Sequence, residues 1–133
     1  MSIALKNVSY TYAPGTAYET TAIRQISVKI EDGEFVGITG ATGCGKSTLI
    51  QLMAGLLTPK EGQILLDGKD INARRYDRSR LRRQVGVVFQ NPECQLFETT
   101  VYRDVTFALR QRNIPEAQRQ QAAEQALAAV GFD

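Results

Sequence analysis

Alternating apolar and polar residues mark two segments near the start of the chain. In residues 3–12, Val8, Tyr10 and Tyr12 share one phase, and residues 22–30 alternate more regularly. A period of two is typical of strands that expose one face. The segment between them, APGTAYET, contains turn-forming residues. We therefore predict two antiparallel strands joined by a turn.

Two uninterrupted apolar runs have a different pattern: FVGIT at residues 35–39 and VGVVF at residues 85–89. Short continuous runs of this kind are typical of strands that are buried on both faces in a parallel sheet. A further segment, QILLDGKDI at residues 63–71, contains Asp67-Gly68, which favours a tight hairpin turn. The sequence thus predicts parallel-type buried strands beside an antiparallel portion.

The rest of the chain has apolar residues at helical spacing. The first helix follows residue 48 and stops near residues 58–62, the second starts near Thr99, and Pro115 opens the third. Their shared apolar faces consist of Leu49, Ile50, Met53 and Leu57 in the first helix, of Val101, Val105, Ala108 and Leu109 in the second, and of Ala123, Ala126, Leu127 and Val130 in the third.

Between the first apolar run and the first helix, Gly40 to Ser47 match the P-loop pattern G-x-x-x-x-G-K-[ST]. Glycines let successive backbone N–H groups point inward around a phosphate chain, and Lys46 adds a positive charge. The alternative, a glycine-rich turn that only joins strand to helix, is disfavoured by the strand–loop–helix context. The residues expected to contact the nucleotide are Gly40, Ala41, Thr42, Gly43, Cys44, Gly45, Lys46, Ser47 and Thr48.

The overall composition adds little to this picture. The chain is 43% hydrophobic and 23% charged, with a net charge of +2, so nothing favours a nucleic-acid partner. No signal peptide or membrane-spanning stretch is visible, and Cys44 and Cys94 do not form a disulfide framework, which fits a reducing cytoplasm. Six arginines in residues 74–83 are interpreted as a solvated helix face, with binding of phosphate, RNA or anionic lipid as the alternative.

Three stretches resemble one protein family. VSYTYAPGTAYETTAI is similar to its opening segment, and GATGCGKSTLIQLMAGLLTPKEGQILLDGKDI to its P-loop block, with Cys44 where serine is commoner. VGVVFQNPECQLFETTVYRDVTFAL resembles its Q-loop. Together they resemble the ATPase subunit of ABC transporters, and more narrowly the energy-coupling factor (ECF) branch. That branch drives the import of vitamins and of transition-metal ions such as cobalt or nickel.

This resemblance implies an α/β fold. Its parts are a RecA-like P-loop NTPase core with an antiparallel β subdomain, in residues 1–90, and a Q-loop with the start of a helical subdomain, in residues 91–133. The chain lacks an LSGGQ signature, the Walker B Asp-Glu pair and any histidine. The run ILLD does not supply a Walker B motif, because Gly68 follows Asp67 where glutamate is needed. We therefore expect the first half of a longer ATPase domain.

The resemblance also implies ATP and Mg²⁺ as cofactors. Tyr12 resembles the aromatic residue that stacks on adenine, with Tyr10 as the alternative in the same phase. Lys46 and Gln90 are the expected catalytic residues, and Ser47 and Gln90 the expected Mg²⁺ ligands. Gln90 can equally be a polar residue at a strand end. Cys44 is expected to replace serine, with a reactive thiol as the alternative.

Two protein partners are implied. One is a second ABC ATPase subunit, identical or not, and the other is an integral-membrane component that docks near Asn91–Glu98, which places the protein at the cytoplasmic face of the membrane. Leu96 and Phe97 can anchor that component or pack into the chain's own core. Three other functions stay open: the ATPase of another ABC transporter class, a different P-loop NTPase such as a nucleotide kinase or GTPase, and nucleotide binding without hydrolysis by these residues alone.

Overall fold

A computed structural model describes residues 1–132. They form two compact units, one comprising Met1–Val87 and the other beginning at Val88. Each unit is described by itself.

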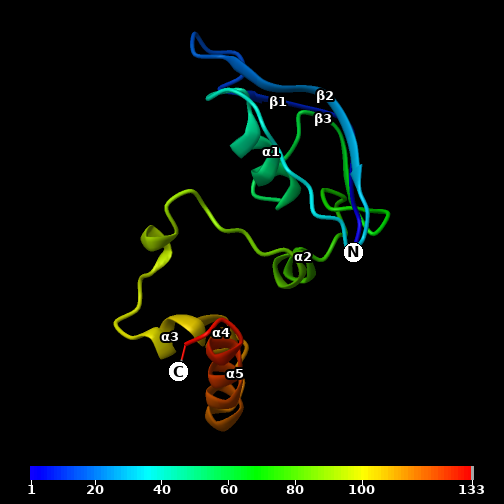
Figure 1. The fold of residues 1–133 in the computed structure, drawn as a ribbon. Coiled ribbons are helices and arrows are strands. Elements are labelled where there is room, and N and C mark those ends of the chain that lie inside the picture. Colours follow the sequence, from blue (N-terminus) through cyan, green and yellow to red (C-terminus); the bar gives the residue numbers. More distant parts are fainter. Residues whose placement is uncertain (133) are drawn as a thin grey trace. The chain divides into compact units, whose positions relative to one another are not determined.

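The first unit contains a four-stranded antiparallel sheet in the order β2-β1-β3-β4 (Figure 1). Its strands are β1 (Ile3–Tyr12), β2 (Thr20–Ile30), β3 (Glu61–Leu66) and β4 (Lys69–Asp70). This confirms the two predicted antiparallel strands and the hairpin at Asp67-Gly68. Both turn residues have positive φ, at 47° and 77°, as a two-residue hairpin turn requires. The run ILLD is therefore a hairpin strand, as predicted.

The pairing between β1 and β2 is irregular. Its register shifts occur between Leu5 and Val8 and again further along β1. Asn7 and Gln25 both have a positive φ there, at 49° and 47°. Serine side chains fill part of the interrupted ladder, since Asn7 N–H donates to Ser27 Oγ at 2.8 Å and Gln25 N–H donates to Ser9 Oγ at 3.0 Å. These positions are bulges in the pair.

Two helices, α1 (Lys46–Met53) and α2 (Arg78–Gln84), contribute to the hydrophobic core of this unit. Figure 1 shows α1 beside the strands. Leu52 of α1 and Leu81 of α2 are buried in one cluster with apolar residues of the sheet. The full cluster is Leu5, Val8, Ile23, Leu52, Met53, Ile64, Leu66, Ile71 and Leu81.

The end of α1 differs from the prediction, which carried the apolar face to Leu57. The helix ends at Met53, and Gly55 turns the chain with a φ of +70°. A Cβ at Gly55 would lie 2.4 Å from Leu81 Cδ2, so the turn packs closely against α2. Leu52, which the predicted face omits, is fully buried, whereas Ile50 is exposed.

The predicted buried strands at residues 35–39 and 85–89 are wrong for the described structure. Neither run belongs to the sheet, Phe35 is fully exposed, and Val88 is 80% exposed. A parallel strand needs hydrogen-bonding neighbours and apolar cover on both faces. No strand within residues 1–132 pairs with either run. Neither run therefore has, among the described residues, the strand neighbours that would bury its apolar side chains.

The second unit is helical. It contains a 3-10 turn, η1 (Pro92–Gln95), and the helices α3 (Val101–Val105), α4 (Phe107–Gln111) and α5 (Glu116–Ala129). Pro115 immediately precedes α5, as predicted, while the second predicted helix is divided at Thr106. In residues 88–132 only Thr106 and Ala123 are buried. The predicted apolar face at Val101, Val105 and Ala108 is therefore exposed rather than packed.

Candidate phosphate-binding site

The glycine loop ends where α1 begins. Gly45 is the residue before the helix and has a φ of +97°, a backbone conformation that other residues rarely adopt. A Cβ there would lie 2.6 Å from the carbonyl oxygen of Ala22 in β2. Glycine is therefore required for two reasons: the backbone conformation, and the close approach of the loop to β2.

Lys46 folds back over this loop. Its Nζ donates to the carbonyl oxygens of Gly40 and Ala41, each at 2.7 Å, and lies 3.7 Å from Cys44 Sγ. The ammonium group thus closes the loop on itself and concentrates positive charge at the point where α1 starts. The N–H groups in the first turn of an α-helix have no intrahelical acceptor, and the helix dipole adds partial positive charge there. Together these groups favour an anion.

The hydroxyl residues after Lys46 differ in exposure. Ser47 is exposed, while Thr48 is buried. Thr48 Oγ1 lies 3.0 Å from the hydroxyl of Tyr12, at the far end of β1. Tyr12 is 40% exposed as a residue, and the half-buried Tyr10 packs edge-on against its ring, with ring centroids 4.9 Å apart and planes at 83°. The structure thus brings Tyr12 to the first turn of α1, next to the glycine loop.

Gln90 belongs to the second unit, where it is exposed in a bend after residues 85–89. The sequence predicted that Gln90 ends a regular strand, and this is wrong, because residues 85–89 form no strand.

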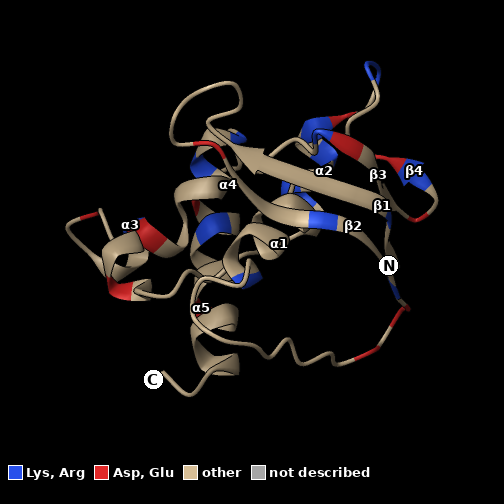
Figure 2. Ribbon diagram, turned by 90° about the horizontal axis from the view of Figure 1, so that it is seen from above, with Lys and Arg blue, Asp and Glu red and all other residues tan. Residues whose placement is uncertain are grey.

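The six arginines of residues 74–83 lie in the first unit, and all of them are exposed. Asp77 caps α2 by accepting from Ser79 N–H and Arg80 N–H. Figure 2 shows the arginine positions of α2 in blue. The predicted exposure is confirmed, but only Arg78, Arg80, Arg82 and Arg83 lie in α2, whereas Arg74 and Arg75 lie in the turn before it.

The second unit contains an open apolar groove of about 560 Å³. Its residues come from the linking segment and from the predicted apolar face of α3 and α4, and they include Leu96, Phe97, Val101, Val105 and Phe107. Phe97 packs edge-on against Phe107, with centroids 4.8 Å apart, yet Leu96 and Phe97 remain 71% and 65% exposed. Of the two alternatives for these residues, packing into a buried core is therefore wrong.

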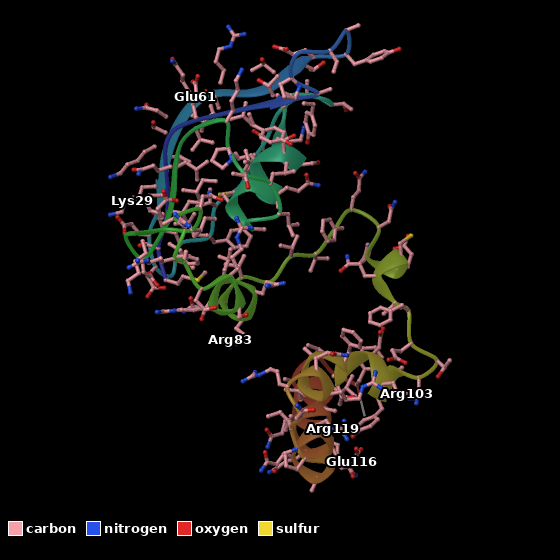
Figure 3. The ribbon with its side chains drawn as sticks, turned by 180° about the vertical axis from the view of Figure 1, so that it is seen from behind. Lys29, Glu61, Arg83, Arg103, Glu116 and Arg119 are labelled. Atoms are coloured by element: carbon pink, nitrogen blue, oxygen red, sulfur yellow. The ribbon has the colours of Figure 1, made fainter. Side chains whose placement is uncertain are left out.

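A polar cluster that the sequence did not predict links α3 to α5. Tyr102 donates to Glu116 Oε1 at 2.5 Å, and Arg119 pairs with the same carboxylate (Figure 3). The hydrogen bond from Tyr102 lowers the pKa of Glu116, with a smaller effect in the same direction from Arg119. The same bond raises the pKa of Tyr102. No periodicity connects residues 14 positions apart on different helices, so no sequence signal was available.

The residues present suit a divalent cation only in part. Within residues 1–132, no group of three or more His, Cys, Asp or Glu side chains lies together. The loop offers the exposed hydroxyl of Ser47. Mg²⁺ commonly takes one or two protein ligands and completes its shell with water and substrate phosphates. A hydroxyl beside a phosphate site fits that mode, although it would not hold the ion alone.

The matching family model covers residues 23–133, and its description is "ABC transporter". The chain belongs to the ABC transporter family. Membership excludes the alternative of a nucleotide kinase or a GTPase, and it agrees with the loop geometry. No described helix of this family member is long and apolar enough to cross a membrane.

Among curated ABC relatives, the chain is 45% identical to the energy-coupling factor transporter ATP-binding protein EcfA2 of Caldanaerobacter subterraneus subsp. tengcongensis. The alignment covers 99% of this chain but 46% of that protein. The chain thus spans about half the length of the curated relatives it matches.

Solved structures of ABC proteins are similar to this chain in fold. CbiO1 from Clostridium perfringens, described as part of the ABC transporter complex CbiONQ, matches with a TM-score of 0.83 at 37% identity, over 98% of this chain and 51% of that one. A dimeric ATP-binding cassette, MJ0796, bound to ADP and Pi in a post-hydrolysis state, matches with a TM-score of 0.78 at 30% identity, over 95% and 56%. The α/β fold of an ABC cassette, with its antiparallel β portion, is thereby confirmed.

Proposed function

We propose that this chain is the nucleotide-binding portion of an ATPase that powers an ECF-type importer of vitamins or transition-metal ions. The observation that carries the proposal is the loop closed by Lys46 at the start of α1, in a chain of the ABC transporter family. Similarity to EcfA2 proteins over nearly the whole chain favours the ECF branch. Similarity to CbiO1, which is described as part of the ABC transporter complex CbiONQ, supports a role in transport.

The loop residues hold the phosphates of ATP. The backbone N–H groups of the loop and of the first helical turn donate to phosphate oxygens, and Lys46 exchanges its two carbonyl acceptors for charged ones. Ser47 supplies an oxygen to Mg²⁺, which neutralises charge on the phosphates when bound. Tyr12 offers a partly exposed ring for adenine. Gln90 is assigned to the attacking water and the Mg²⁺ shell.

The proposed partners are a second ABC ATPase subunit and an integral-membrane component. Dimeric structures of a related cassette, MJ0796, support the first. The exposed apolar groove beside residues 91–98 supports the second, because it presents Leu96 and Phe97 to a docking segment. These partners place the ATPase at the cytoplasmic face of the membrane. In this assignment residues 1–90 are the nucleotide-binding core and residues 91–133 begin the helical subdomain.

The first test is ATP binding by isothermal titration calorimetry, with wild-type chain and Lys46→Ala. Loss of the only lysine in the loop should weaken binding at least tenfold, since charge-assisted hydrogen bonds to phosphate are the strongest contacts available. Lys29→Ala, on the exposed side of β2, is the matched control and should leave ATP affinity unchanged. Equal affinity in the wild type and Lys46→Ala would contradict the phosphate-site assignment.

The second test separates binding from turnover. These 133 residues contain no histidine, LSGGQ signature or Walker B Asp-Glu pair. We therefore expect the chain alone to bind Mg·ATP weakly and to hydrolyse it at background rate, because preorganised electrostatics supply most of the rate. Phosphate release is measured with Lys46→Ala as the contamination control. Rapid turnover that disappears in Lys46→Ala would show that the chain is a complete catalyst.

A further inference from the structure

One hydrogen bond joins the two parts of the proposed nucleotide site. The Tyr12 hydroxyl lies 3.0 Å from Thr48 Oγ1, although the two residues are 36 positions apart. Tyr12 ends β1, and Thr48 lies in the first turn of α1, two residues after Lys46. The bond therefore connects the residue assigned to the base with the helix that begins at the phosphates.

Both partners are held firmly. Thr48 is 6% exposed, and a β-branched side chain has restricted χ1 freedom in a helix. The Tyr12 ring is held a second time by its edge-on contact with Tyr10. A hydroxyl group has one proton and two acceptor positions, so Thr48 can accept from Tyr12 and still donate to another group. The ring and the helix are thus fixed relative to each other while part of the ring stays exposed.

We propose that the Tyr12–Thr48 hydrogen bond is a spacer that sets the distance between the base and the phosphates. This inference rests on the proposed function. It makes Tyr12 a positioning residue through its hydroxyl, in addition to any stacking through its ring. A bond of this kind favours a ligand that occupies both subsites, a nucleoside triphosphate, over a bare phosphate chain that occupies only one.

The alternative is a purely structural role, in which the Tyr12 hydroxyl only provides a hydrogen-bond partner for the buried hydroxyl of Thr48. Removing that hydrogen bond would leave the buried Thr48 hydroxyl without a partner and would destabilise the fold around α1. It would then weaken every ligand of the loop to a similar extent. The comparison of a ligand with a base and one without a base separates the two roles.

The experiment measures the affinities of ATP and of inorganic tripolyphosphate for wild type and Tyr12→Phe by titration calorimetry. Phenylalanine keeps the ring and removes only the hydroxyl. We expect ATP to bind roughly three- to tenfold more weakly, because the ring is no longer held at its distance from the phosphates before the ligand binds, and tripolyphosphate to change less than twofold. Tyr18→Phe removes a hydroxyl from an exposed tyrosine and should change neither affinity.

A double-mutant cycle assigns the effect to the pair. Thr48→Val keeps the side-chain shape, and the readout is the ratio of the ATP and tripolyphosphate affinities. If the hydroxyls act through each other, Tyr12→Phe lowers that ratio in the wild type but not in the Thr48→Val background. Thr48→Ser, which retains the hydroxyl, should preserve the effect of Tyr12→Phe.

Three results count against the proposal. Equal weakening of both ligands by Tyr12→Phe would assign the bond a structural role, and an additive cycle would show that the hydroxyls act separately. An unchanged ATP affinity in Tyr12→Phe would contradict the spacer role of the hydrogen bond but would not affect the assignment of the phosphate site. Failure of the wild type to bind either ligand would instead overturn the proposed function, and the spacer with it.

Discussion

The first unit buries large aliphatic side chains between its sheet and its two helices, whereas the second buries only Thr106 and Ala123 within its described residues. Specific polar links join the elements of the second unit, among them Tyr102 with Glu116 and Arg110 with Glu98. Hydrophobic burial depends little on pH or salt, while ionic links depend on both. The two units should therefore respond differently to the same perturbation.

This difference also relates to function. Segments that bind partners are often drawn from the least stable parts of a fold, because their apolar surface is left accessible. The loop proposed to bind phosphate lies in the unit with the larger core, which suits a site that depends on fixed N–H groups. The groove proposed for the membrane component lies in the unit with almost no core.

The largest expected effect is in the core of the first unit. Leu52→Ala should lower the free energy of unfolding by about 2–5 kcal/mol, because Leu52 is fully buried and the cavity cannot collapse completely. Urea denaturation measures the change. Ile50→Ala, on the exposed side of the same helix, and Val101→Ala, in the second unit, should each cost less than about 1 kcal/mol. A cost for Val101→Ala as large as that for Leu52→Ala would break the contrast between the units.

A smaller loss of stability is expected at Gly62 of β3, where the backbone lies close to that of β1. Gly62 has a φ of +85°, and a Cβ there would lie 2.4 Å from the carbonyl oxygens of Lys6 and Asn7. Gly62→Ala should therefore destabilise this unit by about 1–3 kcal/mol. Gly68→Ala is the matched control, since its φ is +77° but nothing lies within 4 Å of the added Cβ. If both variants lose the same stability in urea denaturation, backbone conformation rather than crowding determines the cost.

The smallest effect is expected in the second unit, and it depends on pH. The hydrogen bond from Tyr102 lowers the pKa of Glu116, so its stabilisation is complete above the ordinary value of 4.5 and is lost as the pH falls through the lowered pKa. Glu116 in turn raises the pKa of Tyr102, whose contribution is present below 10.0 and is lost as the pH rises through the raised pKa. Acid and strong alkali should both loosen the contact between α3 and α5.

NMR titration of the Glu116 carboxyl carbon tests this link directly. Tyr102→Phe removes the donor and should move the pKa of Glu116 upward toward its ordinary value. Tyr18→Phe, in the other unit, is the control and should leave that pKa where it is. An unaltered pKa in Tyr102→Phe would mean that the neighbouring arginines, Arg119 and Arg110, are responsible for the lowering.

Local patterns predicted the local structure well. The hairpin at Asp67-Gly68 and the helix after Pro115 follow from turn and capping chemistry within a few residues. The pairing of β1 with β2 follows from two alternating segments that are close in sequence. The loop from Gly40 to Ser47 precedes α1, as its motif predicts, because the residue types and spacing of that motif are local in the sequence.

Features that depend on distant contacts were missed. The runs at residues 35–39 and 85–89 have the composition of buried strands, but a parallel strand takes its partners from far along the chain. Leu52 was omitted from the buried face because the sheet and α2, rather than helical periodicity, determine which side of α1 is covered. The Tyr12–Thr48 bond was likewise invisible, since it crosses 36 residues.

The bulges at Asn7 and Gln25 have a consequence for the solubility of the protein. Strand β2 is at the end of the sheet, and a long regular edge of that kind can recruit strands from other molecules. At these bulges the hydrogen bonds of Asn7 and Gln25 N–H go to serine hydroxyls, and the left-handed backbone of Gln25 bends the edge. A kinked edge presents a poor template for an incoming strand. Local irregularity in β1 and β2 thus acts as protection against aggregation.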